Sequence, residues 1–395
     1  MPKITPNEQG KFNLPAEFLQ RRHLDPNAAY WLDERDGDLI LHPCQPDARK
    51  IYIEATTACN LNCQTCIRHS WTDPSSHMKK ATFDKILEGI DAFPQLDQVI
   101  LTSFGEPLVH PRIIDMVEKL RERNLTVTVG TNGLLLKDKV AAELVRLGVN
   151  QIVVSIDGIE PVTYEGVRGA QLSVVLENIE RLNKIKDDLG VVYPAVGIEF
   201  VAMKSNQDEL AGLAKLATRL GAARMVVSNL LPYTKEMNAE KLYGYQPVAP
   251  FKSLGYPVRS DVWMRWGVME LPRMHWGAEQ HCRFVNDYAV VVGWDGGVSP
   301  CYALSHSYRY YTIDGVEKQV NRHTFGNVNE TPLADIWMSE DYVHYRSEVR
   351  AFHFPSCADC DLRETCDLRA QNDACWGYNP SCADCLWAQD IVRCP

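Results

Sequence analysis

Long apolar runs are missing from this 395-residue sequence, and so is an excess of positive charge. Stretches such as Ala289–Gly293 are far shorter than the roughly 20 apolar residues that a membrane span needs, and Met1–Glu8 lacks the apolar core of a secretory signal. The 41 basic side chains are outnumbered by 51 acidic ones, and the resulting charge of −10 argues against a surface devoted to nucleic acid or anionic lipid. With 45% hydrophobic and 23% charged residues, the chain is expected to be a globular cytoplasmic protein that contacts no membrane.

Cysteine, by contrast, is abundant and unevenly placed. The chain has 13 cysteines, an odd number, and a reducing cytosol disfavours disulfides, so that spaced cysteines there indicate metal ligands. The cysteines are Cys44, Cys59, Cys63, Cys66, Cys282, Cys301, Cys357, Cys360, Cys366, Cys375, Cys382, Cys385 and Cys394. None lies between residues 67 and 281, and the sequence therefore predicts two separate blocks of metal ligands.

Between the two cysteine blocks, short β-branched segments alternate with segments of helical period. The predicted strands are 50–56, 98–103, 126–130, 151–156, 195–201 and 224–228. The predicted helices are 82–93, 111–123, 137–147, 172–188 and 207–220. Six such units indicate an α/β fold, a partial (β/α)6 TIM-type barrel, whose functional side chains should gather at the carboxyl ends of the strands.

The expected organisation has four parts. They are 1–48, a small β-rich module; 49–230, the partial barrel; 231–281, an irregular bridge; and 282–395, a cysteine-rich domain. The first module combines a β pattern at 11–14, a helix at 15–22, and a hairpin of 29–32 with 38–42.

Directly after the first barrel strand comes a loop with the spacing Cys59-x3-Cys63-x2-Cys66. Three thiolates on one tight loop can hold three corners of a cubic [4Fe–4S] cluster and leave the fourth iron without a protein ligand. The alternative is a zinc site completed by His69, three residues beyond the last cysteine.

This loop, placed after the first strand of a βα repeat, resembles that of the radical S-adenosylmethionine superfamily, over about residues 50–230. The resemblance implies that the free iron chelates the amino and carboxylate groups of S-adenosylmethionine. It also implies reductive cleavage to methionine and a 5′-deoxyadenosyl radical, which abstracts hydrogen from a substrate.

Polar residues follow the next strands, as the resemblance requires. Gly105 and Glu106 lie in a Ser-Phe-Gly-Glu-Pro segment similar to the family's Gly-Gly-Glu-Pro, where glycine permits close backbone approach and glutamate offers an acceptor to the methionyl ammonium. Asn132, Ser155 and Asp157 end the third and fourth strands, where they are expected to hold the ribose hydroxyls and the carboxylate. Turn and helix-cap chemistry is the alternative for these residues.

Two departures from the family pattern stand beside these matches. Phe104 replaces the first glycine, and Thr65 replaces the aromatic residue expected before the third cysteine. Segments 197–200 and 228–233 are candidates for adenine and substrate contacts, with plain core packing as the alternative.

The later cysteines resemble the SPASM extension of this superfamily, which holds two auxiliary [4Fe–4S] clusters. By matching position, Cys282 and Cys301 would share one cluster, with Cys375 as the displaced partner. Cys357, Cys360 and Cys366 would hold the other, completed by Cys385 or Cys382, and Cys394 is unassigned. The family's fourth cysteine is replaced here by Ala370, and zinc ribbons are the alternative. Cys44 is interpreted as a free thiol.

The first module resembles AbrB/SpoVT swapped-hairpin domains, which dimerise and often bind DNA. Residues 1–45 carry five basic and seven acidic side chains, a net −2, which favours dimerisation or docking over DNA binding. This module together with the ending 379–389 resembles the maturases of tungsten-cofactor oxidoreductases.

The resulting hypothesis is a radical S-adenosylmethionine enzyme that modifies a protein, a peptide or a bulky cofactor, with the maturation of a tungsten enzyme as the finer assignment. A reductase, ferredoxin or flavodoxin would supply the electron. The first alternative is a maturase of ribosomal peptides, and the second, of another class, is an AbrB-like DNA-binding regulator with zinc ribbons. The sequence does not identify a general base.

Overall fold

The computed structural model describes residues 8, 14–21, 30–35, 37–244, 268–275, 277–373, 375–376 and 379–394. The chain divides into two compact units, residues 1–47 and 48–395. No helix in these described ranges is both long enough and apolar enough to span a bilayer.

The first unit contains α1 (Ala16–Arg21), β1 (Tyr30–Arg35) and β2 (Asp38–Pro43). The two strands form an antiparallel hairpin in which Arg35 pairs with Asp38, and Gly37 adopts φ 84° in the turn. The predicted helix and hairpin are therefore confirmed. The β pattern predicted at 11–14 lies almost wholly outside the described residues.

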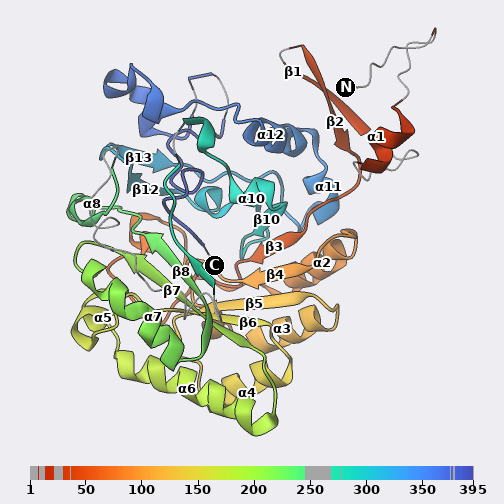
Figure 1. Ribbon diagram of the computed structural model, residues 1–395. Helices are drawn as coiled ribbons and strands as arrows, with labels where there is room; N and C mark the ends of the chain where they lie inside the picture. The colour runs from red at the N-terminus through yellow and green to blue at the C-terminus, as the bar shows by residue number, and fades with distance from the viewer. Residues whose placement is uncertain are drawn as a thin grey trace. The chain divides into compact units, whose positions relative to one another are not determined.

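The second unit is built on a nine-stranded sheet in the order β11-β10-β3-β4-β5-β6-β7-β8-β9 (Figure 1). Its strands are β3 (Lys50–Ile53), β4 (Gln98–Leu101), β5 (Thr126–Thr131), β6 (Gln151–Ser155), β7 (Ala195–Ala202), β8 (Ala222–Asn229), β9 (Val268–Glu270), β10 (Ala289–Val292) and β11 (Val298–Ser299). All neighbours are parallel except β10 and β11. The interior strand positions are buried and rich in Val and Ile, as a sheet covered on both faces requires.

The helices between these strands are α2 (Lys80–Ile90), α3 (Ile113–Arg121), α4 (Asp138–Arg146), α5 (Pro161–Arg168), α6 (Leu172–Leu189), α7 (Leu210–Arg219) and α8 (Lys235–Glu240). Helices α2, α3, α4, α6 and α7 lie along the outer side of the sheet (Figure 1). The six predicted strands and five predicted helices are all confirmed within a few residues at their ends. Helices α5 and α8 were not predicted.

The remaining elements belong to the cysteine-rich region: α10 (Arg283–Asn286), β12 (Tyr308–Tyr311), β13 (Glu317–Val320), α11 (Leu333–Trp337) and α12 (Glu340–Arg350). Short 3-10 turns occupy Ile67–Ser70, Pro107–Val109, Gln207–Glu209, Gly277–Glu279, Tyr302–Leu304, Cys357–Asp359, Arg363–Thr365 and Asp367–Ala370.

The sheet extends beyond the six predicted strands at both edges. Strand β10 pairs in parallel with β3, so that Val290 lies opposite Ile51, and β9 pairs with β8. All four residues of β10 are buried, because its apolar side chains need cover on both faces. The cysteine-rich region is thereby joined to the strand that carries the three-cysteine loop.

The segment 386–394 runs back along the carboxyl end of β8. The Ile391 carbonyl accepts hydrogen bonds from the Asn229 amide at 3.2 Å and from its side chain at 3.1 Å, and the Arg393 amide donates to Ser228 Oγ at 3.0 Å. These contacts place Trp387 and Cys394 in the interior of the second unit, where both side chains line cavities.

Candidate functional site

The three-cysteine loop opens onto a cavity at the carboxyl ends of the parallel strands. Cys59, Cys63 and Cys66 line this cavity, which we call the cysteine-loop cavity and whose volume is about 150 Å³. The five other predicted site residues line it as well: Gly105, Glu106, Asn132, Ser155 and Asp157. Strands separated by up to 100 residues thus deliver their polar ends to one place, as parallel sheets do.

Each cysteine sulfur of the loop has a nitrogen donor beside it. The Leu61 amide donates to Cys59 Sγ at 3.4 Å and Arg68 Nε to Cys66 Sγ at 3.2 Å, while Arg168 Nη1 lies 3.9 Å from Cys63 Sγ. Burial raises the pKa of the Cys59 and Cys63 thiols, so that thiolates here need compensating charge. These three donors, two of which are guanidinium groups, fit an anionic cluster, because such contacts hold and tune cluster thiolates.

His69, the ligand of the zinc alternative, is engaged elsewhere. Its Nε2 lies 3.2 Å from the Cys63 carbonyl oxygen, and its ring stacks on Tyr233 with a centroid distance of 5.9 Å. Tyr233 in turn donates its hydroxyl to the Gln64 carbonyl at 2.6 Å. These contacts support the loop's backbone instead of completing a ring of ligands.

Gly105 is required by the approach of two backbone segments. A Cβ at this position would lie 2.1 Å from the Thr56 carbonyl oxygen and 2.9 Å from that of Ala58. The next residue, Glu106, donates its amide to the Ala58 carbonyl at 2.8 Å. The turn after β4 therefore clamps the start of the cysteine loop, and no side chain fits between them.

Glu106 is a buried carboxylate with several protein donors. It accepts hydrogen bonds from the Leu108 amide at 3.0 Å, Thr131 Oγ1 at 2.8 Å and the Asn132 amide at 2.6 Å. Burial raises its pKa, and these hydrogen bonds oppose that rise. A positioned carboxylate at the cavity wall has the chemistry that an ammonium ligand requires.

The residues after β5 and β6 are held in the same wall. Asn132 donates to Asn60 Oδ1 at 2.8 Å, and Asp157 accepts from the Val201 amide at 2.9 Å. Ser155 Oγ donates to Glu199 Oε2 at 3.3 Å. The roles of these residues toward S-adenosylmethionine stay predictions.

Arg168 was missed from the sequence although it lines the cysteine-loop cavity. Its Nε lies 2.6 Å from Asp157 Oδ2, and this carboxylate raises the pKa of the guanidinium despite burial, so Arg168 stays charged. It ends helix α5, which starts with Pro161 and stops at Gly169, with φ 69°. Proline at the first turn and glycine after the last are helix signals that could have located it.

Glu199 on β7 also lines the cysteine-loop cavity. Its side chain is partly buried. Burial and the charge of Asp157 raise its pKa to about 7. The neighbouring Phe200 is fully buried in the core, so of these two residues only Glu199 reaches the cavity.

A second, more apolar cavity of about 190 Å³ adjoins the first, and we call it the inner cavity. Thr65, Cys66, Thr102, Ser103, Phe104, Glu199 and Val201 line both cavities. Its remaining walls come from Ser228 to Leu231, Tyr302, Trp387 and Val392 to Cys394. The two sequence departures, Thr65 and Phe104, therefore lie where the two cavities meet.

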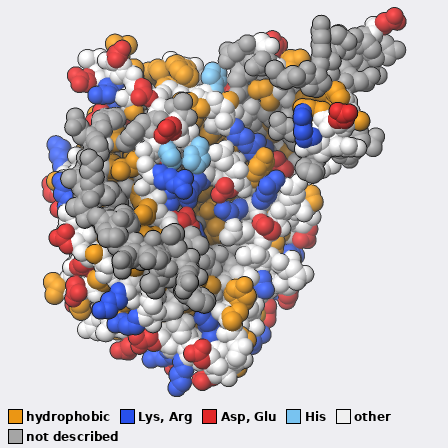
Figure 2. Space-filling view, in the orientation of Figure 1, with side chains coloured by type: hydrophobic (Ala, Val, Ile, Leu, Met, Phe, Trp, Pro, Cys, Tyr) orange, Lys and Arg blue, Asp and Glu red, His pale blue; other side chains and the backbone are white. Residues whose placement is uncertain are grey.

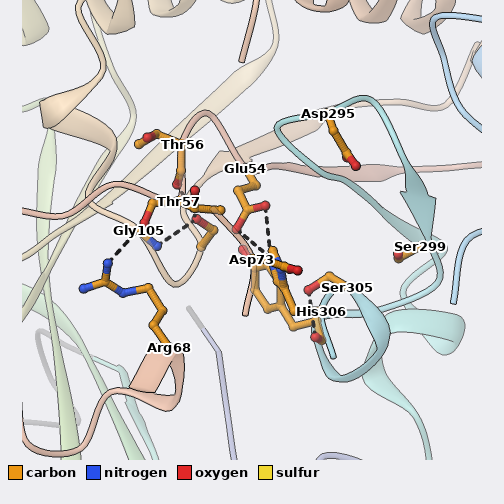
Figure 3. Close-up of polar contacts among 12 residues, drawn as sticks. Glu54, Thr56, Thr57, Arg68, Asp73, Gly105, Asp295, Ser299, Ser305 and His306 are labelled. Atoms are coloured by element: carbon orange, nitrogen blue, oxygen red, sulfur yellow. Dashed lines mark hydrogen bonds and ion pairs between the residues drawn. The ribbon is translucent and has the colours of Figure 1, made fainter. Parts of the chain in front are cut away.

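A buried histidine joins the cysteine-rich region to the cysteine loop. The ring of His306 lies between Glu54 and Asp73 (Figure 3), with Nε2 3.0 Å from Glu54 Oε1 and Nδ1 in contact with Asp73 Oδ2. Trp71 packs against the same ring at a centroid distance of 3.9 Å. Since both ring nitrogens face carboxylates, this arrangement favours the protonated imidazole, in which both nitrogens donate.

This contact predicts a pH-dependent stability. Burial lowers the pKa of His306, but the hydrogen bonds and charges of Glu54 and Asp73 raise it by more than burial lowers it. The net shift of the pKa is therefore upward. A raised folded-state pKa stabilises the fold fully below the unfolded value of about 6.5, and that stabilisation is lost as pH rises through the folded pKa. The difference in melting temperature between wild type and His306→Gln should therefore shrink with rising pH. A difference that is constant across this range would contradict the assignment.

Four of the auxiliary cysteines lie near one another in the second unit, and three of them are buried: Cys282, Cys301 and Cys382. Cys385 lies near enough to Cys282, Cys301 and Cys382 for its charge to add to their pKa values, and burial raises the pKa of all four thiols, that of Cys282 to about 12. Cys375, the expected partner of Cys282 and Cys301, is exposed. The ligand sets of the auxiliary clusters stay predictions, and in the structure Cys382 and Cys385 lie closer to Cys282 and Cys301 than the sequence-based pairing with Cys375 supposed.

The other cysteines of the second block are more open. Burial and the charge of Asp384 raise the pKa of Cys357 to about 12, and Cys366 lies near enough to add to that rise. Cys360 is exposed. Among the described residues, no three His, Cys, Asp or Glu side chains are arranged around a single metal ion.

Family comparisons agree with this site. The radical SAM superfamily model matches residues 53–216, and the SPASM iron–sulfur cluster-binding model matches residues 282–361. The chain belongs to the radical S-adenosylmethionine superfamily and carries a SPASM domain, so it is an enzyme of S-adenosylmethionine and a [4Fe–4S] cluster. These matches decide against the DNA-binding regulator.

Two individual proteins match this chain over most of its length. The chain is 39% identical over 349 residues, 87% of its length and 96% of the relative's, to the tungsten-containing aldehyde ferredoxin oxidoreductase cofactor-modifying protein of Pyrococcus furiosus. It is 21% identical to the AdoMet-dependent heme synthase of Nitratidesulfovibrio vulgaris, over 84% of this chain and 89% of that one.

Solved structures show the same fold. Streptococcus suis SuiB bound to S-adenosylmethionine matches with a TM-score of 0.58 at 18% identity, over 83% of this chain and 73% of that one. Native anSMEcpe with bound AdoMet matches with a TM-score of 0.58 at 14% identity, over 86% and 94%.

Proposed function

We propose that this enzyme modifies the cofactor of a tungsten-containing oxidoreductase, or the oxidoreductase that carries it. The proposal rests on the 39% identity to a protein of that description, which extends over nearly the full length of both chains. The inner cavity supports a substrate that enters beside the cysteine loop, since it is apolar and continuous with the cysteine-loop cavity.

In this proposal, the three loop cysteines hold the cluster that cleaves S-adenosylmethionine. Glu106 accepts from the methionyl ammonium, and Arg168 faces the carboxylate. Asn132 and Ser155 hold hydroxyl groups, and Asp157 positions Arg168 through the 2.6 Å ion pair.

We further propose two auxiliary [4Fe–4S] clusters. Cys282, Cys301, Cys382 and Cys385 hold the first, and Cys357, Cys360 and Cys366 supply ligands to the second. Three clusters require about 12 irons per chain after anaerobic reconstitution. Cys301→Ala is expected to remove about four of them while 5′-deoxyadenosine is still released, and Cys44→Ser, a change in the other unit, should leave the iron content unaltered. Unchanged iron in Cys301→Ala, or zinc in place of iron, would reject this ligand set.

The substrate is tested with the oxidoreductase itself. The tungsten enzyme produced without this protein is incubated with the reconstituted chain, S-adenosylmethionine and reductant, and its cofactor is then compared by mass spectrometry. We expect a mass change that requires S-adenosylmethionine. A short precursor peptide modified in a parallel reaction, with no change in the tungsten cofactor, would instead support the peptide-modifying alternative.

The partners follow from the same hypothesis. A ferredoxin, flavodoxin or reductase would donate the electron for cleavage.

The hairpin of the first unit would form a homodimer, because Trp31, Leu32 and Leu39 are 48%, 63% and 56% exposed and an isolated hairpin is marginally stable. Figure 2 shows acidic and basic side chains interspersed on the visible face, which favours protein partners over DNA.

A further inference from the structure

The thiol of Cys394 lies in the wall of the inner cavity. Strand β8 holds the surrounding segment through the contacts of Asn229 with Ile391 and of Ser228 with Arg393. Cys66 of the cysteine loop lines the same cavity. The C-terminal segment thus places the Cys394 thiol in the wall of the inner cavity that Cys66 also lines.

Cys394 has surroundings different from those of the auxiliary cysteines. Trp387 Nε1 donates to its sulfur at 3.2 Å, and the charged groups that act on it are Glu199 and Arg283. Burial raises its pKa, so the sulfur keeps its hydrogen. In the described part of the chain, the cysteines whose charges raise the pKa values of Cys282 and Cys301 are Cys282, Cys382 and Cys385. Cys394 is not among them.

Asn229 supplies an independent sign that the inner cavity binds a ligand. This side chain is 1% exposed and lines the cavity, its Nδ2 donates to the Ile391 carbonyl, and its Oδ1 has no hydrogen-bond partner. A buried acceptor without a donor is costly, and native structures seldom keep one without reason. A ligand with an N–H or O–H group in the inner cavity would satisfy it.

We propose that Cys394 is a hydrogen-atom relay between the 5′-deoxyadenosyl radical and a substrate held in the inner cavity. The radical takes the hydrogen atom of the Cys394 S–H bond, which forms the new C–H bond of 5′-deoxyadenosine and leaves a thiyl radical. The thiyl radical then takes hydrogen from a substrate C–H bond, which restores S–H and leaves the substrate radical. One unpaired electron is conserved throughout, and no further oxidant is needed.

This relay rests on the proposed function, because it requires S-adenosylmethionine cleavage. It makes a prediction that needs no knowledge of the substrate. A thiol exchanges its hydrogen with solvent, whereas carbon-bound hydrogens do not, so a radical quenched by Cys394 acquires solvent hydrogen. In deuterium oxide, 5′-deoxyadenosine formed without substrate should then carry one deuterium.

The experiment uses the reconstituted full chain in deuterium oxide with S-adenosylmethionine, a reductant and no added thiol. Mass spectrometry measures deuterium per 5′-deoxyadenosine. We expect Cys394→Ser and Cys394→Ala to lower the labelled fraction at least about tenfold, to the background level, and Cys44→Ser to retain it. Iron per chain, measured on the same samples, should equal that of the wild type, because the relay thiol holds no cluster.

The outcomes separate the two levels of the proposal. Absence of 5′-deoxyadenosine in the wild type would contradict the radical chemistry itself. Unlabelled 5′-deoxyadenosine in the wild type, or label that persists in Cys394→Ser, would overturn the relay and leave the proposed function standing. Loss of about four irons in both Cys394 variants would also overturn it and make Cys394 a cluster ligand.

Discussion

Replacing Cys59, Cys63 and Cys66 together by alanine is expected to abolish 5′-deoxyadenosine formation. The three thiols line one cavity and each has its own nitrogen donor, so their removal takes away every loop ligand at once. The iron content should fall by about four per chain, while the auxiliary clusters stay. Anaerobic reconstitution followed by iron determination and chromatography of the nucleoside products measures both effects.

The matched control for the triple variant is Cys44→Ser, which removes a thiol from the first unit. It should keep both iron and 5′-deoxyadenosine. Cleavage that persists in the triple variant would reject the loop as the site of chemistry.

Gly105→Ala is expected to be nearly as damaging, although it adds a single methyl group. The new Cβ would lie 2.1 Å from the Thr56 carbonyl oxygen, which is backbone and cannot rotate away. The turn after β4 and the cysteine loop must then separate, and a displacement of about 1 Å at a reacting centre can cost about 100-fold in rate. We expect 5′-deoxyadenosine release to fall by about that factor, with weaker binding of S-adenosylmethionine by calorimetry.

Gly166→Ala is the control, since its Cβ would meet nothing within 4 Å and it lies within helix α5. This substitution should leave release unchanged and stabilise the helix by up to about 1 kcal/mol. Equal activity of Gly105→Ala and Gly166→Ala would show that the clamp between the turn and the loop is not needed.

Much of the fold follows from local pattern. The β-branched strands and amphipathic helices between residues 50 and 230 have the periods that parallel sheets and their covering helices require, and the structure confirms each predicted element. The edge strands β9 and β10 could not be assigned in this way. Their pairing with β8 and β3 joins segments distant in sequence, and such contacts depend on which sheet edges are left open.

The residues of the candidate site likewise fall into those predicted from the sequence and those that only the structure located. Gly105, Glu106, Asn132, Ser155 and Asp157 were predicted from the resemblance to the radical S-adenosylmethionine superfamily, together with their place at the carboxyl ends of parallel strands, and all five line the cysteine-loop cavity. Arg168 was not predicted, and Glu199 was covered only by the broad candidate segment 197–200. One ends an unpredicted helix and the other follows an ordinary strand pattern, so their position at the cavity depends on packing.

The amino-acid sequence by itself determined that this protein has a three-cysteine cluster loop on a βα framework, because cysteine spacing and hydrophobic period act over a few residues. Only the tertiary structure decided which remote groups meet. Cys382 and Cys385 join Cys282 and Cys301, His306 bridges Glu54 and Asp73, and Cys394 enters the inner cavity. The physical reason is that these contacts close loops of up to about 250 residues, whose closure is driven by burial of the whole core and not by local preference.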